Sequence, residues 1–328
     1  MPPDPKRPDR ELIEDVAAHL RTEPGLIEKD WHVTRAIGAL ATNTLATNTL
    51  ATNTLATNTL ATGDPGTVRP AFGGGTSLSK GWGLIKRFSE DIDFKVALPS
   101  PSSRTGGRNQ RRAYRDRVLT ILLDAGFGLL ADPMKRDEGR FFSAEFLYPS
   151  LFDPGRGLRP HLRIEMSFKP FTLPPVHRPI ASLINTVRAA PAEVAAFPCV
   201  DPVETAAEKL SALAWRVLTW QAGVGDPAVI RHLHDLAALM PRLARSGDFW
   251  ALAAEAMTED TSRGGLPAAF TDPAARLAAL LDRLEQDRHW AADYANYVRQ
   301  VSFAAAAETI AFPDALAALR ALAESGRP

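Results

Sequence analysis

The spacing of apolar residues predicts helices at the start of the chain and a sheet after them. Apolar side chains recur with helical spacing in residues 10–21 and 26–40. Shorter apolar runs between turn-forming residues follow, and such runs are typical of strands. They predict strands at residues 68–72, 92–98, 126–130, 141–148 and 158–168. The same region is expected to hold two helices, at residues 76–80 and 110–125, and a Ser/Gly/Arg loop at residues 100–109.

Beyond residue 201 the apolar pattern is helical almost throughout and rich in Ala and Leu. Several prolines lie near expected helix starts, where the first turn tolerates them. A proline-rich stretch at residues 170–200 marks the change of pattern. We therefore expect an α/β (α+β) domain with a small mixed sheet of about five strands, then an all-α domain, with the active site between them.

The expected organisation has four segments. They are N-terminal helices in residues 1–40, a repeat in 41–66, an α/β core in 67–190 and a helical domain in 191–328. The repeat is ATNTL, which occurs four times without change from Ala41 to Leu60. Its period matches neither a helix nor a strand, so we interpret it as an inserted linker or an irregular helical extension.

Composition narrows the class of protein. Among 328 residues, 38 Lys and Arg balance 38 Asp and Glu, so no global charge attracts the chain to nucleic acid or anionic membrane. The single cysteine, Cys199, excludes a disulfide framework and a cysteine-rich zinc site. The polar, proline-rich start lacks a secretory signal, and no apolar run reaches the ~20 residues that span a bilayer. We expect a cytoplasmic protein without a membrane partner.

The segment from Gly73 to Phe94 carries the strongest chemical signal. It ends in Asp91-Ile92-Asp93, and side chains alternate along a strand, so both acids should share one face. Paired carboxylates suit Mg²⁺ that carries phosphate. The triple glycine and the short helix upstream offer backbone N–H groups to phosphate oxygens. A glycine turn, a helix and then D-x-D on a strand is the layout of a nucleotidyltransferase.

This run resembles the nucleotidyltransferase toxin family typified by AbiEii of abortive-infection systems. The family pattern GGT-x-L-x-K, a spacer and R-x-S-E-D-I-D-F is matched by Gly74-Gly75-Thr76, Leu78, Lys80 and Arg87 to Phe94. Three further islands follow the family order. They are Ile27-Glu28-Lys29-Asp30-Trp31, Pro202 to Leu210 and Arg231 to Leu236.

The resemblance implies a polymerase-β-like fold and an enzyme that transfers NMP from an NTP, with Mg²⁺, to a macromolecular acceptor. Relatives imply tRNA 3′ ends as that acceptor. They also imply a type IV toxin–antitoxin system, whose antitoxin acts indirectly or on transcription rather than in a tight complex. Two alternatives stay open: transfer to a small-molecule hydroxyl, as in antibiotic-adenylylating enzymes, and a catalytically silent nucleotide-binding protein.

Site residues follow from the motif and the resemblance. Asp91 and Asp93 are the expected metal ligands and catalytic acids, with Glu165 as a third acid and Glu145 in reserve. The resemblance adds two catalytic residues, Lys209 and Asp235, which would neutralise the triphosphate and orient a cation or move a proton. The expected nucleotide-binding residues are Gly74, Gly75, Thr76, Ser77, Lys80, Arg87, Ser89 and Lys209. Arg87 is alternatively an ion-pair partner of Glu90.

A cluster of arginines follows the acid strand, between Arg104 and Arg117. Such clusters bind phosphate backbones with an affinity that falls as salt rises. A solvated helix face explains the same pattern equally well. We therefore keep both readings, a tRNA contact and a plain surface.

Overall fold

The structure is a computed structural model, and it describes residues 7–47, 68–100, 103–153, 158–221, 227–262, 266 and 268–325. The chain forms two compact units. The first consists of Met1–Trp82 and Phe88–Val200, and the second of Gly83–Arg87 and Asp201–Pro328. The first unit extends to Val200, because the strand Val194–Cys199 pairs within its sheet.

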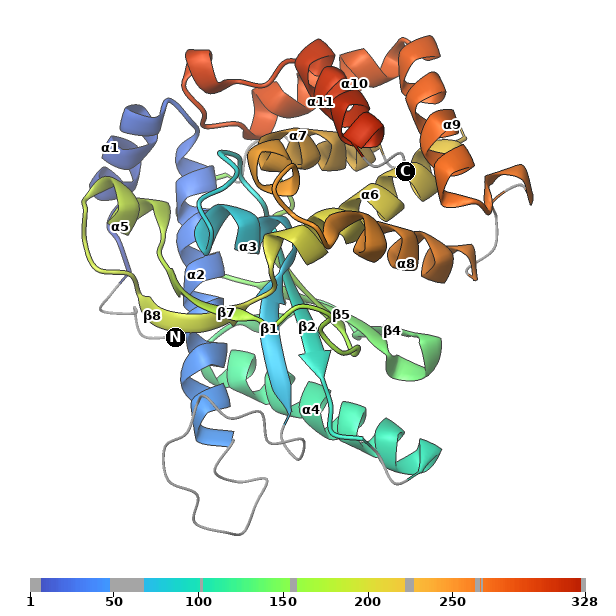
Figure 1. Ribbon diagram of the computed structural model, residues 1–328. Coiled ribbons are helices and arrows are strands. Elements are labelled where there is room, and N and C mark those ends of the chain that lie inside the picture. Colours follow the sequence, from blue (N-terminus) through green and yellow to red (C-terminus); the bar gives the residue numbers. More distant parts are fainter. Residues whose placement is uncertain are drawn as a thin grey trace. The chain divides into compact units, whose positions relative to one another are not determined.

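The first unit is built on a mixed sheet, which has eight strands within the described residues (Figure 1). Its order is β3-β5-β6-β2-β1-β8-β7, with β4 paired to β5. The strands are β1 (Arg69–Gly73), β2 (Asp91–Ala97), β3 (Gly128–Leu129), β4 (Met134–Arg136), β5 (Phe141–Leu147), β6 (Leu162–Ser167), β7 (Val176–Ile180) and β8 (Val194–Cys199). At the centre, β2 pairs antiparallel with β1 and parallel with β6.

The sheet is larger than the five strands predicted. All five predicted strands are present, and β4, β7 and β8 were missed. β4 is exposed along its whole length, so no apolar residue marks it. The edge strand β7 contains Pro179, and β8 contains Pro198, and proline argues against a strand in a sequence pattern although edges tolerate it.

Five helices accompany this sheet in the described part of the first unit. They are α1 (Arg10–Leu20), α2 (Pro24–Thr47), α3 (Gly74–Lys80), α4 (Arg104–Asp124) and α5 (Leu183–Val187). The loop predicted at residues 100–109 is wrong in its second half, because α4 begins at Arg104. The Ser103 hydroxyl accepts a hydrogen bond from the Gly106 N–H and caps that helix. Helix α2 runs into the start of the ATNTL repeat, and residues 48–60 of the repeat lie outside the described ranges.

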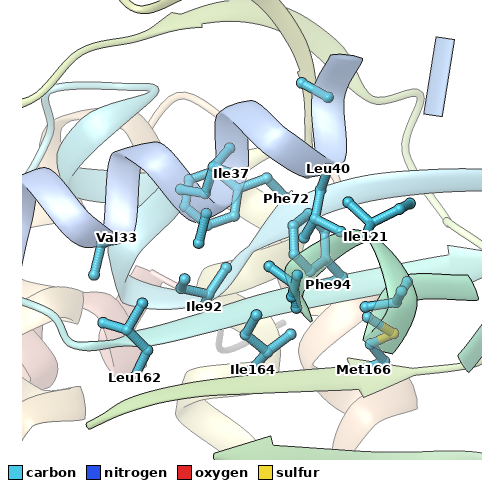
Figure 2. Packing of buried hydrophobic residues seen from close by; sticks show 14 of the residues in the cluster. Val33, Ile37, Leu40, Phe72, Ile92, Phe94, Ile121, Leu162, Ile164 and Met166 are labelled. Atoms are coloured by element: carbon cyan, nitrogen blue, oxygen red, sulfur yellow. The ribbon is translucent and has the colours of Figure 1, made fainter. Parts of the chain in front are cut away.

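The core lies between the sheet and two helices. Apolar residues of α2 and α4 pack on alternate residues of the central strands, as Figure 2 shows. The labelled members are Val33, Ile37, Leu40, Phe72, Ile92, Phe94, Ile121, Leu162, Ile164 and Met166. Because alternate residues of β2, β5 and β6 enter this core, the residues between them point to the opposite face of the sheet.

Cys199 belongs to this interior. It is fully buried in β8, opposite Phe72 of β1, and a Cβ on Gly81 would lie 2.9 Å from its Sγ. Burial raises the pKa of the Cys199 thiol to about 11. The thiol is therefore protonated and enclosed in the folded protein.

The described part of the second unit is helical. Its helices are α6 (Pro202–Leu218), α7 (Arg231–Leu243), α8 (Phe249–Thr261), α9 (Pro273–Gln286), α10 (His289–Val301) and α11 (Phe312–Ser325). Pro202 occupies the first turn of α6, where a proline was predicted, and the Asp201 side chain caps the helix. The segment Gly83–Arg87 joins this unit through a β-bridge between Arg87 and Ser302 and a hydrogen bond from the Phe303 N–H to the Lys86 carbonyl. None of the helices described is long and apolar enough to cross a membrane.

Candidate active site

The acid pair lies on β2 in the middle of the sheet. The apolar residues next to the two acids enter the core, so Asp91 and Asp93 point to the opposite face. The parallel strand β6 places Glu165 directly beside Asp93 in register. Both chain neighbours of Glu165 also enter the core, so its side chain shares the face of the acid pair. The structure thus brings the three predicted acids to one face of two adjacent strands.

The glycine turn places backbone directly against Asp93. Strand β1 ends at Gly73 and helix α3 begins at Gly74, whose φ is +66°. A Cβ on Gly74 would lie 1.8 Å from Oδ2 of Asp93, a distance that no side chain can occupy. Glycine at position 74 is therefore required both by the left-handed backbone and by the close approach. The turn and the acid strand form one structural element.

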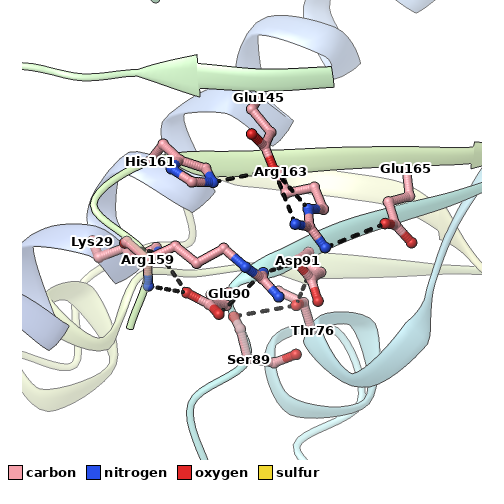
Figure 3. A network of polar contacts seen from close by, with 10 residues as sticks. All are labelled: Lys29, Thr76, Ser89, Glu90, Asp91, Glu145, Arg159, His161, Arg163 and Glu165. Atoms are coloured by element: carbon pink, nitrogen blue, oxygen red, sulfur yellow. Dashed lines mark hydrogen bonds and ion pairs between the residues drawn. The ribbon is translucent and has the colours of Figure 1, made fainter. Parts of the chain in front are cut away.

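The residues that follow Gly74 hold the acid strand in place. The Thr76 hydroxyl donates to the Asp91 carbonyl and lies 3.2 Å from the carbonyl oxygen of Ser89 (Figure 3). Gly75, Thr76 and Ser77 are all buried. The Thr76 side chain, predicted to bind nucleotide, is thereby used to position the beginning of β2.

Lys80 anchors α3 to α2. Its ammonium lies 2.6 Å from Oδ1 of Asp30 and donates to the Thr34 hydroxyl at 2.9 Å and the Ala181 carbonyl at 3.2 Å. The side chain is 6% exposed. In this structure three protein acceptors hold the Lys80 ammonium, and its predicted contact with phosphate stays a prediction.

Charged residues of α2 extend the network to the acid strand. Lys29 lies 2.5 Å from Oε2 of Glu90 and donates to the Arg159 carbonyl at 2.7 Å. Nη1 of Arg159 lies 2.7 Å from Oδ1 of Asp91 and 3.1 Å from Oε1 of Glu90 (Figure 3). Burial lowers the pKa of Lys29 and its pairing with Glu90 opposes that effect. One acid of the pair is therefore held by an arginine that α2 supports.

The structure separates the roles of Glu165 and Glu145. Glu145 lies on β5, one strand further from β2, and Oε1 of Glu145 accepts from Nη2 of Arg163 at 2.9 Å. Its hydrogen bond to Arg163 lowers the pKa of Glu145. Nη1 of Arg163 lies 3.9 Å from Glu165. Glu165 is thus the acid adjacent to Asp93, and Glu145 orients the arginine between them.

The second unit carries a buried charged triad. Nε and Nη2 of Arg87 donate to the two carboxylate oxygens of Asp235 at 2.7 and 2.6 Å. Nζ of Lys209 lies 2.8 Å from Oδ2 of the same carboxylate, which is fully buried. Arg87 pairs with Asp235, while Glu90, the alternative partner considered for Arg87, pairs with Lys29 and Arg159. The two residues taken from the resemblance, Lys209 and Asp235, are in direct contact.

The electrostatics of the triad fix its protonation. Burial raises the pKa of Asp235, but the charges of Arg87 and Lys209 lower it more strongly, and it lies well below its usual range. Burial lowers the pKa of Lys209, and Asp235 opposes that effect. An acid held so firmly in its ionised form is a poor proton acceptor. The ionised Asp235 carboxylate contacts both cations, Arg87 and Lys209.

The first unit offers carboxylate oxygens to a divalent ion. Across the described residues no three His, Cys, Asp or Glu side chains converge as a complete metal centre. Mg²⁺ typically uses one or two carboxylates and takes its other ligands from phosphate and water. Asp91 and Asp93 are residues of that type, and Oδ1 of Asp91 lies 2.7 Å from Nη1 of Arg159.

A family model described as "Nucleotidyl transferase AbiEii toxin, Type IV TA system" matches residues 64–320. The match covers the glycine turn and the acid strand as well as Lys209 and Asp235. The chain belongs to the AbiEii family of nucleotidyltransferase toxins. It is thus a nucleotidyltransferase, and membership of a type IV toxin–antitoxin system implies an NTP substrate and a cognate antitoxin.

The fold agrees with the AbiEii assignment. The solved structure of MenT4, a nucleotidyltransferase toxin from Mycobacterium tuberculosis H37Rv, superposes with a TM-score of 0.55 at 20% sequence identity. The alignment covers 95% of this chain and 88% of MenT4. A search of curated proteins gave no match. The predicted nucleotidyltransferase fold class is thereby confirmed.

Several members of the AbiEii site were not assigned a role from the sequence. Lys29 stands in a motif that the resemblance singled out, but its partner Glu90 is distant along the chain. Arg159 and Arg163 carry no motif. The parallel register of β2 and β6 places Arg163 beside Asp91, and Arg159, which contacts Asp91, lies just before β6. From the sequence, strand alternation around Glu165 already places Arg163 on the polar face of the sheet, and this pattern could have identified it.

Proposed function

We propose that this AbiEii-family enzyme transfers NMP from a Mg²⁺-bound NTP to a macromolecular acceptor, and that the acceptor is tRNA. The observation that carries the proposal is the set of Asp91, Asp93 and Glu165 on one sheet face, with the Gly74 backbone against Asp93. When bound, the ion would supply positive charge to the phosphates. Asp91 and Asp93 would hold it.

The proposed reaction is a single displacement at the α-phosphorus of the NTP. An acceptor hydroxyl forms a bond to the α-phosphorus, the bond from that phosphorus to the α,β-bridging oxygen breaks, and pyrophosphate leaves. Glu165, beside Asp93, is our choice for the acid that receives the acceptor proton. Lys209, oriented by Asp235, supplies positive charge to the triphosphate.

Support for tRNA comes from toxin membership rather than from the arginine cluster. Arg104 and Arg108 both pair with Glu138, and Arg115 is buried against the Gly139 carbonyl. These contacts reduce the charge that the cluster offers to a phosphate backbone. The exposed pairs are individually weak and exchangeable, so the cluster stays a secondary candidate for RNA contact.

We further propose that the enzyme acts in the cytoplasm and that the antitoxin does not form a tight complex with it. The antitoxin would act on transcription or on the effect of the toxin. Co-purification of tagged toxin and antitoxin tests this point, and a stable stoichiometric complex would contradict it.

The decisive experiment follows the label from the NTP. Purified protein is incubated with Mg²⁺, each α-labelled NTP, and total RNA, protein or small metabolites in turn. We expect label in tRNA, no label with Asp93→Ala, and normal labelling with the exposed-acid control Asp116→Ala. Label only in small molecules would support transfer to a small hydroxyl. Bound NTP without any transfer would support a silent nucleotide-binding protein.

The choice of third acid has its own test. Glu165→Gln should lower kcat by about 10²-fold or more, since general-base catalysis contributes factors of about that size. Glu145→Gln should have a much smaller effect, because Glu145 contacts Arg163 and lies one strand further away. Steady-state kinetics of both variants decides between them, and the reverse order of effects would move the assignment to Glu145.

A further inference from the structure

The backbone of Arg159 is held at both of its polar groups. Its N–H donates to Oε2 of Glu90 at 2.9 Å, and its carbonyl accepts from Nζ of Lys29 at 2.7 Å. Lys29 is 2% exposed and also pairs with Glu90 at 2.5 Å. The clamp around position 159 is therefore part of the packed interior and does not depend on the Arg159 side chain.

The side chain of Arg159 is in a different situation from its backbone. It is 31% exposed, and its contacts are the two carboxylates of Asp91 and Glu90, at 2.7 and 3.1 Å (Figure 3). A fixed backbone with a long, solvent-reachable side chain allows the guanidinium to move while its Cα stays in place. Arg159 can therefore change the partner of its side chain without a change in its backbone.

The guanidinium and the divalent ion of the proposed function compete for the same carboxylate, that of Asp91. Asp91 cannot hold both cations closely, because the two positive charges repel each other at short range. When the ion arrives with its nucleotide, the guanidinium loses Asp91 as its partner, and phosphate oxygens become available nearby. A guanidinium fork matches phosphate geometry with two parallel hydrogen bonds.

We propose that Arg159 is a nucleotide-binding residue that neutralises Asp91 before substrate arrives and then turns its guanidinium to a phosphate oxygen of the bound NTP. This inference rests on the proposed function of the acid pair. It assigns Arg159 two successive partners, a carboxylate and then a phosphate, and each partner gives a measurable effect of opposite sign.

The test measures metal binding and nucleotide binding separately in the full-length protein. Mn²⁺ alone is titrated by electron paramagnetic resonance, and uncleavable α,β-methylene analogues of the four NTPs with Mg²⁺ are titrated by calorimetry. Arg159→Ala should bind Mn²⁺ several-fold more tightly, since its competitor is gone. It should bind the best analogue at least about tenfold more weakly, since a hydrogen bond between charged groups is lost.

Three variants control the result. Arg159→Lys should restore part of the nucleotide affinity, because it keeps the charge but not the fork. Arg283→Ala, which removes an exposed arginine of the second unit paired with Asp287, should change neither titration. If Arg159→Ala fails to fold, as judged by circular dichroism, Arg159→Gln gives the same two readouts without the charge.

The outcomes separate the inference from the proposed function. Loss of metal and nucleotide binding together in Arg159→Ala would overturn the inference in favour of a purely structural role. Tighter metal binding with unchanged nucleotide binding would overturn it as well. If the wild-type protein binds no nucleotide and transfers no label, the proposed function itself fails, and the inference fails with it.

Discussion

At the scale of single residues, the contact between Gly74 and Asp93 limits where the Asp93 carboxylate can lie. The space that a Cβ on Gly74 would need is filled by the Asp93 carboxylate, so residue 74 can carry no side chain. The chemistry of the acid pair therefore depends on a residue that has no functional group.

Gly74→Ala should abolish nucleotide transfer and destabilise the fold by more than the ~1–2 kcal/mol cost of a left-handed non-glycine residue. The added methyl group must displace Asp93 as well as strain the backbone. Gly83→Ala is the matched control, because Gly83 has φ +62° but no atoms within 4 Å of its Cβ position. Urea unfolding and transfer assays compare the two, and equal effects would show that the contact with Asp93 is unimportant.

Residues differ in how far the sequence predicts their roles. The shared face of Asp91 and Asp93 follows from alternation within one strand, so a local pattern was sufficient. The role of Lys80 depends on Asp30, which lies on a different helix far along the chain. A sequence pattern shows that a lysine is present but not which carboxylate it reaches.

At the scale of elements, helices α6 and α7 are joined by the carboxylate of Asp235. Lys209 of α6 and Arg87 both contact this acid of α7, which is fully buried. Removing one partner of a buried ion pair leaves uncompensated charge, which costs about 3–5 kcal/mol. The triad is therefore a structural requirement as well as a candidate part of the active site.

Asp235 should make stability fall in acid. Its pKa in the folded protein lies well below the usual 3.8, so the stability that it contributes is complete above pH 3.8 and is lost as pH falls through the lower folded value. Asp235→Asn should be destabilised by about 3–5 kcal/mol at pH 7, with a smaller difference from wild type below about pH 4. Urea unfolding over a pH series measures this. Asp116→Asn should match wild type throughout, and a pH-independent difference for Asp235→Asn would contradict the prediction.

Elements were predictable where one periodicity dominated. The core strands and helices α1, α2 and α6 follow from apolar spacing. Strand β4 has no buried residue, so no apolar pattern predicts it. The first turn of α4 depends on the cap at Ser103, which lies in a segment with the composition of a loop. In these places hydrogen bonds determine the structure, and the pattern of hydrophobic residues does not indicate them.

At the scale of the whole molecule, the family match from residue 64 to 320 spans parts of both compact units. The sequence motifs that resemble the family contain Asp91 and Asp93 in one unit and Lys209 and Asp235 in the other. No motif points to Arg163 or Arg159, because their places beside Asp91 depend on the pairing of β2 with β6 and on the path of the chain before β6.

Expression of the chain alone should slow bacterial growth, as expected of a toxin. Asp93→Ala should relieve the effect, because that variant lacks one acid of the pair, and Asp116→Ala should stay toxic at equal protein level. Growth curves with immunoblots of each variant provide the measurement. Equal growth inhibition by wild type and Asp93→Ala would show that the toxicity does not arise from nucleotide transfer.

The enclosed thiol of Cys199 provides a probe that needs no mutation. Cys199 is the single cysteine of the chain, and it lies on β8 opposite Phe72 of β1, the strand that leads to the glycine turn. Because it is fully buried, alkylating reagents should not reach it in the native state. Its rate of modification by a maleimide under native conditions would then report how often the centre of the sheet opens. Substrate that binds at the adjoining turn should slow that rate, so a mass spectrometer could follow ligand occupancy through one sulfur atom.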